Sequence, residues 1–388
     1  MSAGPKHKNL GLLRRRTAQA ADRARKPVVV LFSDDSTLIF ARRMRDALHA
    51  SDPACPVQMV WFTDETALSY RQMSQLLPEG PDRIVSGKAL VAMMGSDRIA
   101  AILTSRVYRA MIGRLKNPVA RWSGGRPCIV GFLGGLDFFP EQGFVRRRNC
   151  DAVYLFPRPA LAAYDAQIAG STEGWQGLGF GHPSVMLPQG PPADLATRRD
   201  VYFFTQALSP STARGRLHVL RMMAAIARAN PARRVFIKLR HLPDENRDHL
   251  HLERHDYPAL MAQLPQVPPN LHLTDITMEE ALETAAIGIT CTSTAALDVV
   301  RAGLPCMVYL DFVDSYRDAL VAPMRGLFAH SNLVASTAQV LALAPAPPDR
   351  DWMEDMFCPR DLGARVLDTV AQFHARDFQI NADMANAR

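Results

Sequence analysis

Three groups of polar residues in the second half of the chain each follow a predicted strand, and their side chains could bind an anion. Residues 238–241 read Lys-Leu-Arg-His, residues 291–294 read Cys-Thr-Ser-Thr, and Gln206 follows a third strand. Cations, hydroxyls and amides of this kind donate hydrogen bonds to phosphates and carboxylates. The candidate anion ligands are therefore Gln206, Lys238, Arg240, His241, Thr292, Ser293 and Thr294.

Each of these groups also has a simpler explanation. Thr292, Ser293 and Thr294 precede a predicted helix over 295–302, where hydroxyl residues commonly serve as N-caps. His241 could be an ordinary loop residue and Lys238 a solvated strand residue. Glu253, further along the same loop, could accept a hydrogen bond from a ribose or base, or could simply cover the loop.

The elements around these groups alternate between strand and helix. Apolar, β-branched runs predict strands over 27–32, 57–62, 99–104, 127–132 and 152–156, and then over 200–205, 234–239, 271–273, 287–290 and 306–310. Helical patterns between them cover 38–50, 68–77, 107–115, 212–230, 278–285 and 295–302, with a closing helix over 362–375. This alternation predicts an α/β protein with two Rossmann-like, doubly wound domains facing across a cleft. In parallel sheets, ligands bind at the carboxyl ends of the strands.

A change in composition divides the chain. Glycine and proline are concentrated in 170–193, which predicts the end of one domain and a linker. Gly177, Gly179 and Gly181 do not have the spacing of a dinucleotide fingerprint. We expect a flexible basic arm at 1–26, an N-terminal domain at 27–190, a nucleotide-binding domain at 191–350, and a closing helix and tail at 351–388.

The composition indicates a soluble protein in a reducing compartment. The chain has 388 residues, 48% of them apolar, and its six cysteines are scattered without metal-ligand spacing. No apolar run has the length of a membrane span, and no secretory signal is evident. We therefore expect a cytoplasmic protein with reduced cysteines.

The formal net charge of +7 is concentrated near the N-terminus. Residues 1–26 carry eight basic residues against one acidic residue, so the remainder is close to neutral. A nucleic-acid-binding body would carry its basic face on the fold itself, so we expect no nucleic-acid partner. The arm could dock on an anionic membrane surface, at the periphery of the inner membrane, or could be a solvated tail.

The KLRH group, the HLE at 251–253 and the later CTSTAALDVVRAGLP at 291–305 together resemble the C-terminal half of a GT-B glycosyltransferase. They are similar to bacterial capsule and polysaccharide transferases that use CMP-linked sugars, such as sialyl- and Kdo-transferases. The resemblance implies that Lys238, Arg240, His241, Ser293 and Thr294 bind the phosphate and ribose of the donor. It covers 200–312 well, and the segment GFLGGLDFFPEQGFVRRRNCDAVYLF at 131–156 resembles related glycosyltransferase-like proteins.

The sequence departs from that family in one place. The family's usual His-Pro is replaced by Arg-His-Leu-Pro, with Pro243 one position late. Either Arg240 or His241 could therefore take the role of the family histidine.

An inverting transferase also needs a general base for the acceptor hydroxyl. In this architecture the base comes from the N-terminal domain, where acidic residues follow predicted strands: Asp34, Asp35, Asp137 and Glu141. Asp137, next to Gly134-Gly135, is the first choice, whereas Asp34 and Asp35 could instead cap the first helix. No DxD motif stands at a strand end, so we expect no metal and no cofactor beyond the nucleotide-sugar co-substrate.

The leading hypothesis is thus a metal-independent, inverting glycosyltransferase with a nucleotide-sugar donor, favouring a CMP-linked acidic sugar, and a glycan or lipid-linked acceptor. The alternatives are a polyol-phosphate transferase of the teichoic-acid type, a UDP-sugar epimerase, and a non-catalytic nucleotide- or sugar-binding protein. The epimerase would need several carboxylates and a histidine in the cleft.

Overall fold

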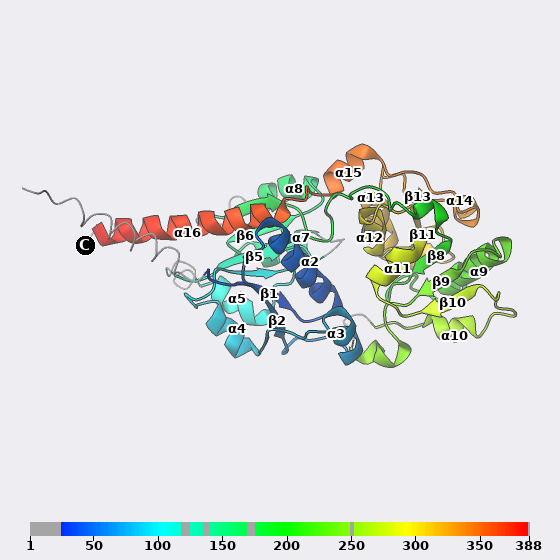
Figure 1. Cartoon of the computed structure of the whole chain (residues 1–388), viewed down its shortest axis with the longest axis horizontal. Coiled ribbons are helices and arrows are strands. Elements are labelled where there is room, and N and C mark those ends of the chain that lie inside the picture. Colours follow the sequence, from blue (N-terminus) through cyan, green and yellow to red (C-terminus); the bar gives the residue numbers. More distant parts are fainter. Residues whose placement is uncertain (1–24, 118–124, 135–139, 169–174, 249–251, 387–388) are drawn as a thin grey trace, which may run out of the picture.

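A computed structural model shows two α/β lobes side by side (Figure 1) and describes residues 25–117, 125–134, 140–168, 175–248 and 252–386. The N-terminal lobe contains a seven-stranded sheet and the C-terminal lobe a six-stranded sheet. Every strand pair in both sheets is parallel. The predicted pair of Rossmann-like domains is therefore confirmed.

The N-terminal sheet has the order β3-β2-β1-β4-β5-β6-β7. Its strands are β1 (Val28–Phe32), β2 (Val57–Phe62), β3 (Arg83–Val85), β4 (Ala101–Thr104), β5 (Cys128–Phe132), β6 (Ala152–Leu155) and β7 (Gly177–Phe180). Its helices are α2 (Asp35–Ser51), α3 (Tyr70–Leu76), α4 (Gly87–Met93), α5 (Arg109–Leu115), α7 (Pro140–Arg147) and α8 (Pro159–Ile168). All five residues of β1, VVVLF, are buried, as expected for a central strand covered on both faces.

The C-terminal sheet has the order β10-β9-β8-β11-β12-β13. Its strands are β8 (Asp200–Phe204), β9 (Val235–Lys238), β10 (Leu271–Thr274), β11 (Ala285–Thr290), β12 (Cys306–Tyr309) and β13 (Val334–Ala335). The helices that follow β7 are α9 (Ala213–Ala229), α10 (Tyr257–Met261), α11 (Met278–Thr284), α12 (Ala295–Arg301), α13 (Val321–Leu327), α14 (Thr337–Leu341), α15 (Arg350–Met356) and α16 (Leu362–Asn386). Three 3-10 turns, η1 (Leu195–Thr197), η2 (Pro243–Asp248) and η3 (Ser315–Arg317), complete the described elements.

The structure corrects the sequence analysis at the glycine-rich stretch. Gly177 and Gly179 belong to β7, the edge strand of the N-terminal sheet, rather than to a linker. A Cβ at Gly179 would lie 2.4 Å from the ring of Tyr154, so packing against β6 requires glycine there. The first connection between the lobes is consequently shorter than predicted and begins after Phe180.

The C-terminal segment is also more ordered than the predicted tail. α16 runs from Leu362 to Asn386; its first part lies along the N-terminal lobe and its far end projects beyond that lobe (Figure 1). At Gly363 a Cβ would lie 2.1 Å from the carbonyl oxygen of Ala47, so glycine permits α16 to approach α2 closely. The chain thus crosses between the lobes twice.

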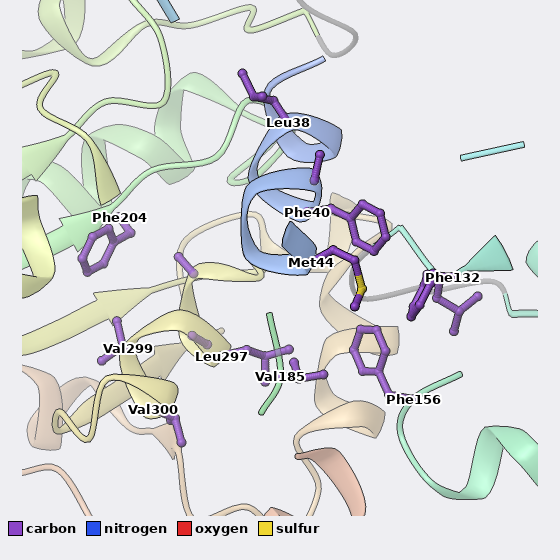
Figure 2. Close-up of a cluster of buried hydrophobic side chains, with 14 of the residues drawn as sticks. Leu38, Phe40, Met44, Phe132, Phe156, Val185, Phe204, Leu297, Val299 and Val300 are labelled. Atoms are coloured by element: carbon purple, nitrogen blue, oxygen red, sulfur yellow. The ribbon is translucent and has the colours of Figure 1, made fainter. Parts of the chain in front are cut away.

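These two crossings are hydrogen-bonded to each other. The amide of Cys358 donates to the carbonyl of Val185 at 2.8 Å, and the amide of Leu187 donates to the carbonyl of Cys358 at 2.9 Å. Buried apolar side chains surround them, and Figure 2 shows members of this cluster from α2, β5, the first crossing and α12. We call the two hydrogen-bonded crossings, around residues 182–187 and Cys358, the hinge. One buried apolar cluster continues from lobe to lobe through this hinge.

His182 is the polar residue at the centre of this hinge. Its ring is 5.3 Å from the rings of both Phe40 and Phe156, and its Nδ1 accepts a hydrogen bond from the amide of Ser184 at 3.1 Å. Burial lowers the pKa of His182, and the nearby Arg43 and Arg147 guanidinium groups act in the same direction, so that the pKa is about 3. The imidazole is therefore neutral in the folded protein.

The neutral His182 predicts a loss of stability in acid. Between pH 6.5 and about 3 the unfolded chain binds a proton at this residue that the folded chain does not, so stability is fully present above pH 6.5 and falls as the pH drops. The slope from one such group is about 1.4 kcal/mol per pH unit. His182→Asn, which retains an acceptor for Ser184, should flatten the pH dependence of the unfolding free energy measured with urea.

The exposed His330 offers a matched control. His330→Asn should reproduce the wild-type slope. Identical slopes for wild type and His182→Asn would contradict this account of the hinge.

Candidate functional site

A cavity of about 780 Å³ lies between the lobes, at the carboxyl ends of both sheets. The loops after β1, β4 and β5 line one side, and the loops after β8, β9, β10 and β11 line the other. The charged residues among the described lining are Arg71, Arg106, Arg146, Arg147, Lys238 and Arg240, with Asp34, Asp35, Asp275 and Asp298. The cations outnumber the carboxylates, so the cavity favours an anionic ligand.

The structure brings most of the predicted anion ligands together. Gln206, Lys238, Arg240, Thr292, Ser293 and Thr294 all line the cavity. This follows from the parallel C-terminal sheet, because the carboxyl ends of β8, β9 and β11 meet at one edge.

The hydroxyl cluster after β11 combines local structural contacts with access to the cavity. The hydroxyl of Thr292 donates to Gln206 Oε1 at 3.0 Å, and Ser293 Oγ accepts from the amide of Ala295 at 3.2 Å. Thr294 is the N-cap residue of α12, but its side chain makes no capping hydrogen bond. Ser293 and Thr294 thus keep donor capacity on the cavity side.

Lys238 is partly buried at the end of β9, and its Nζ donates to the carbonyl of Leu239 at 2.7 Å. Burial and the nearby Arg71 guanidinium together lower the pKa of Lys238 to about 8, although the carboxylates of Asp275, Asp35 and Glu279 oppose the shift. The side chain is therefore largely charged at neutral pH but loses its proton more easily than an ordinary lysine. An anion bound in the cavity would stabilise the charged form.

Arg240 spans the cleft to the N-terminal lobe. Its Nε donates to Asp35 Oδ2 at 3.1 Å, and its Nη2 donates to Asp35 Oδ1 at 3.0 Å. The Asp35 carboxylate raises the pKa of Arg240 above its ordinary value, in spite of burial. Arg240 is therefore charged, and its two-pronged donor edge is bonded to Asp35 at the cavity.

His241 and Glu253 lie elsewhere. His241 is 2% exposed and is absent from the cavity lining, as is Glu253. His241 Nε2 is 3.8 Å from Glu253, which forms an ion pair with Arg216. The structure thus places Arg240, and not His241, at the cavity.

Arg216 is a residue that the sequence analysis missed. Its buried guanidinium donates to Glu253 and to carbonyl oxygens of the loop after β8 and of the segment near Glu253: Gln206, Ala207, Pro210 and His255. It therefore holds the loop that carries Gln206. An arginine at 216 in the helical stripe that continues with Val219, Leu220 and Met223 was the available signal.

The candidate bases differ in their environments. Asp34 is 3% exposed, caps α2 by accepting from the amide of Thr37 at 2.8 Å, and pairs with Arg106 at 3.2 Å. Asp35 lines the cavity and bonds Arg240. Asp137 lies outside the described residues, as does the side chain of Glu141.

Two further arginines join the lobes, and neither was among the residues predicted from the sequence. Arg43 on α2 contacts Asp298 at 2.5 Å and Glu279 at 3.4 Å. Arg71 on α3 contacts Glu245 at 2.6 Å and Asp275 at 3.2 Å. Burial opposes ionisation of Glu245, but hydrogen bonds from Arg71, the amide of Leu242 and Ser69 outweigh it and lower the Glu245 pKa to about 2.

Within the described ranges, no three His, Cys, Asp or Glu side chains are grouped so that they could hold a metal ion. None of the described helices combines the length and apolar character needed to cross a membrane.

The two parallel-sheet lobes with a cleft between their carboxyl edges define the GT-B fold. Residues 28–373 match the family described as "Putative glycosyltransferase (DUF6716)", and the chain belongs to this family. No protein of curated function matches the sequence.

Several solved structures share the fold. UDP-GlcNAc 2-epimerase from Methanocaldococcus jannaschii is 8% identical with a TM-score of 0.56, over 89% of this chain and 99% of that chain. UDP-GlcNAc 2-epimerase from Neisseria meningitidis, bound to UDP-GlcNAc, is 11% identical with a TM-score of 0.54, over 89% and 100%. MurG from Acinetobacter baumannii is 13% identical with a TM-score of 0.47, over 89% and 99%. At these identities the likeness to the two epimerases shows the fold alone.

The Arg43–Asp298 pair provides a test of how the lobes are held together. Asp298→Ala leaves the largely buried Arg43 with the more distant Glu279, and we expect a loss of about 3–5 kcal/mol in unfolding free energy. The double variant Arg43→Met, Asp298→Leu should recover part of this loss, because the buried Arg43 charge is removed together with its partner, while Arg301, 4.0 Å from Asp298, loses that contact. Urea denaturation measures both.

The exposed Arg350–Glu354 pair is the control. Glu354→Ala should change stability little, as is usual for surface pairs. Equal losses for Asp298→Ala and Glu354→Ala would show that the cross-cleft pair does not hold the lobes.

Proposed function

We propose that the protein is a metal-independent, inverting glycosyltransferase that moves a sugar from a nucleotide donor to a glycan or lipid-linked acceptor. The observation that carries this proposal is the interlobe cavity, in which Lys238 and Arg240 face acidic residues of the opposite lobe. Membership of a family described as glycosyltransferases supports the same class. The donor would lie against the C-terminal lobe and the acceptor against the N-terminal lobe.

The cationic lining fits the phosphates of a nucleotide sugar. Arg240 presents two parallel donors, the geometry that binds a phosphate in a bidentate manner. Lys238 would add a point charge, and Ser293 and Thr294 would add hydroxyl donors. These groups would stabilise the negative charge that develops on the leaving phosphate, so the proposed reaction uses no metal and no cofactor.

The identity of the nucleotide is a finer proposal. The sequence resemblance favours a CMP-linked acidic sugar, whereas an epimerase of the same fold has been seen bound to UDP-GlcNAc. A thermal-shift screen with CMP, CDP, UDP and GDP distinguishes them, because a ligand that binds the folded state raises its melting temperature. A shift with none of the four would count against a nucleotide donor altogether.

The proposed chemical step needs one proton acceptor. The acceptor hydroxyl oxygen forms a bond to the anomeric carbon, and the bond from that carbon to the donor phosphate breaks, with its electron pair going to the phosphate. The hydroxyl proton passes to a carboxylate. Among the described candidates we assign this role to Asp35, because Asp34 is buried in its capping contacts; Asp137 remains the alternative.

A UDP-sugar epimerase is less well supported by the cavity. Such an enzyme would need a histidine in the cleft, and no histidine stands among the described residues that line it.

A polyol-phosphate transferase would transfer a phosphorus-containing group, so the phosphorus content of the product separates it from a sugar transferase. A non-catalytic binding protein would bind the nucleotide without releasing it from its sugar.

Replacing the base should reduce turnover. Asp35→Asn preserves the shape of the side chain and removes its basicity, and we expect turnover to fall about 10²- to 10⁴-fold. Release of nucleotide from the donor identified by the thermal-shift screen measures this. Asp34→Asn is the control. Because Asp34 caps α2, its replacement should lower the melting temperature and leave the turnover of the folded enzyme nearly unchanged. Near-normal turnover of Asp35→Asn would return the role to Asp137.

We also propose that residues 1–26 contact anionic membrane surfaces, as their eight basic residues suggest. Removing residues 1–26 should reduce sedimentation with vesicles containing an anionic phospholipid and leave the melting temperature nearly unchanged. Equal sedimentation with and without the arm would contradict this.

A further inference from the structure

The Arg240–Asp35 pair occupies the part of the cleft that a donor phosphate would need. Both residues line the cavity, Arg240 from the loop after β9 and Asp35 from the first turn of α2. The side chains are 24% and 14% exposed, and two hydrogen bonds of 3.0 and 3.1 Å join them. The guanidinium fork is therefore already engaged by a carboxylate of the opposite lobe.

This pair differs from the other two connections across the cleft. Arg43 and Arg71 each contact two carboxylates of the C-terminal lobe. In the described part of the chain, Arg240 forms an ion pair with one carboxylate, that of Asp35. The lobes would consequently remain joined by Arg43 and Arg71 if the Arg240–Asp35 pair opened.

Resting on the proposed glycosyltransferase function, we propose that Asp35 holds the phosphate site of Arg240 in the empty cleft and that the donor phosphate displaces it. A guanidinium fork binds carboxylate and phosphate oxygens in the same bidentate geometry, so one can replace the other. The single phosphate of a CMP-linked sugar carries the same charge as the carboxylate but would also gain Lys238, and a diphosphate would add a second negative charge. The exchange is thus favourable once a donor is present.

The displaced Asp35 would stay where a base is needed. Its Oδ1 also accepts a hydrogen bond from the amide of Ser36 at 2.8 Å, a local contact within the first turn of α2. That contact does not depend on Arg240, so it keeps the carboxylate at the N-terminal wall of the cavity. Donor binding would then release the carboxylate that accepts the proton of the acceptor, and the empty enzyme would keep it engaged.

This exchange makes an unusual prediction for a candidate base: its removal strengthens binding. Asp35→Asn removes the anion that competes with phosphate, and we expect affinity for UDP, CMP and inorganic diphosphate to rise about tenfold or more, as for one charge-assisted hydrogen bond. Calorimetric titration measures this without turnover. A residue that is only a base would leave the affinity unchanged.

Asp275→Asn is the matched control. Asp275 also lines the cavity and carries the same charge, but it pairs with Arg71 rather than Arg240. We expect the affinity of Asp275→Asn for these ligands to stay within about threefold of the wild-type value. Such a change is well below the contribution of one charge-assisted hydrogen bond. Equal gains for both variants would mean that net charge alone governs binding, and would overturn the exchange. Asp35→Ala, which removes the carboxylate without introducing an amide, should show the same gain as Asp35→Asn.

The outcomes separate this inference from the proposed function. If the wild-type protein binds a nucleotide and Asp35→Asn binds it equally or more weakly, the exchange is wrong and the proposed function stands. If wild type and both Asp35 variants bind no nucleotide and no diphosphate, both are wrong. Tighter binding by Asp35→Asn and Asp35→Ala, with unchanged binding by Asp275→Asn, supports the exchange.

Discussion

The structure depends on arginines of one lobe meeting carboxylates of the other. Arg43 and Arg71 extend from the N-terminal lobe, and Arg240 extends from the C-terminal lobe in the opposite direction. A largely buried guanidinium is costly unless it is paired, so each contact restricts how far the lobes can separate. The hinge around His182 supplies the apolar counterpart, with buried side chains continuous from lobe to lobe. The ion pairs and the hinge therefore fix the width of the cleft and the side chains that face each other across it.

The parallel sheets decide what faces the cleft. Because all strands of each sheet run in one direction, the loops at their carboxyl ends gather at one edge, and the two edges oppose each other. Residues far apart in the sequence, such as Asp35 and Arg240, become neighbours in this way. The proposed transferase chemistry uses this geometry directly, with phosphate donors on one wall and a proton acceptor on the other.

The fold was largely predictable from sequence, but the contacts across the cleft were not. Alternating strands and helices identified five strands of each sheet but missed the edge strands β3 and β13, and polar residues at strand ends predicted that Lys238 and Arg240 face the cleft. β7 was missed because Gly177 and Gly179 lack β propensity, although packing on Tyr154 requires glycine at 179. The choice between Arg240 and His241 needed the structure, in which 238 and 240 are partly exposed while 239 and 241 are buried. The pairing of Arg43 with Asp298 depends on how two lobes dock, which no local pattern encodes.

The central claim is that the cavity recognises the phosphates of a nucleotide through Arg240 and Lys238. Calorimetry comparing UDP with uridine and CMP with cytidine tests this most directly, in wild type and in Arg240→Met. The account predicts that each nucleotide binds at least about tenfold more tightly than its nucleoside, since each charge-assisted hydrogen bond contributes about 1.5–3 kcal/mol, and that Arg240→Met removes most of the difference. Equal affinity for nucleotide and nucleoside in the wild-type protein, or a difference that persists in Arg240→Met, would contradict it.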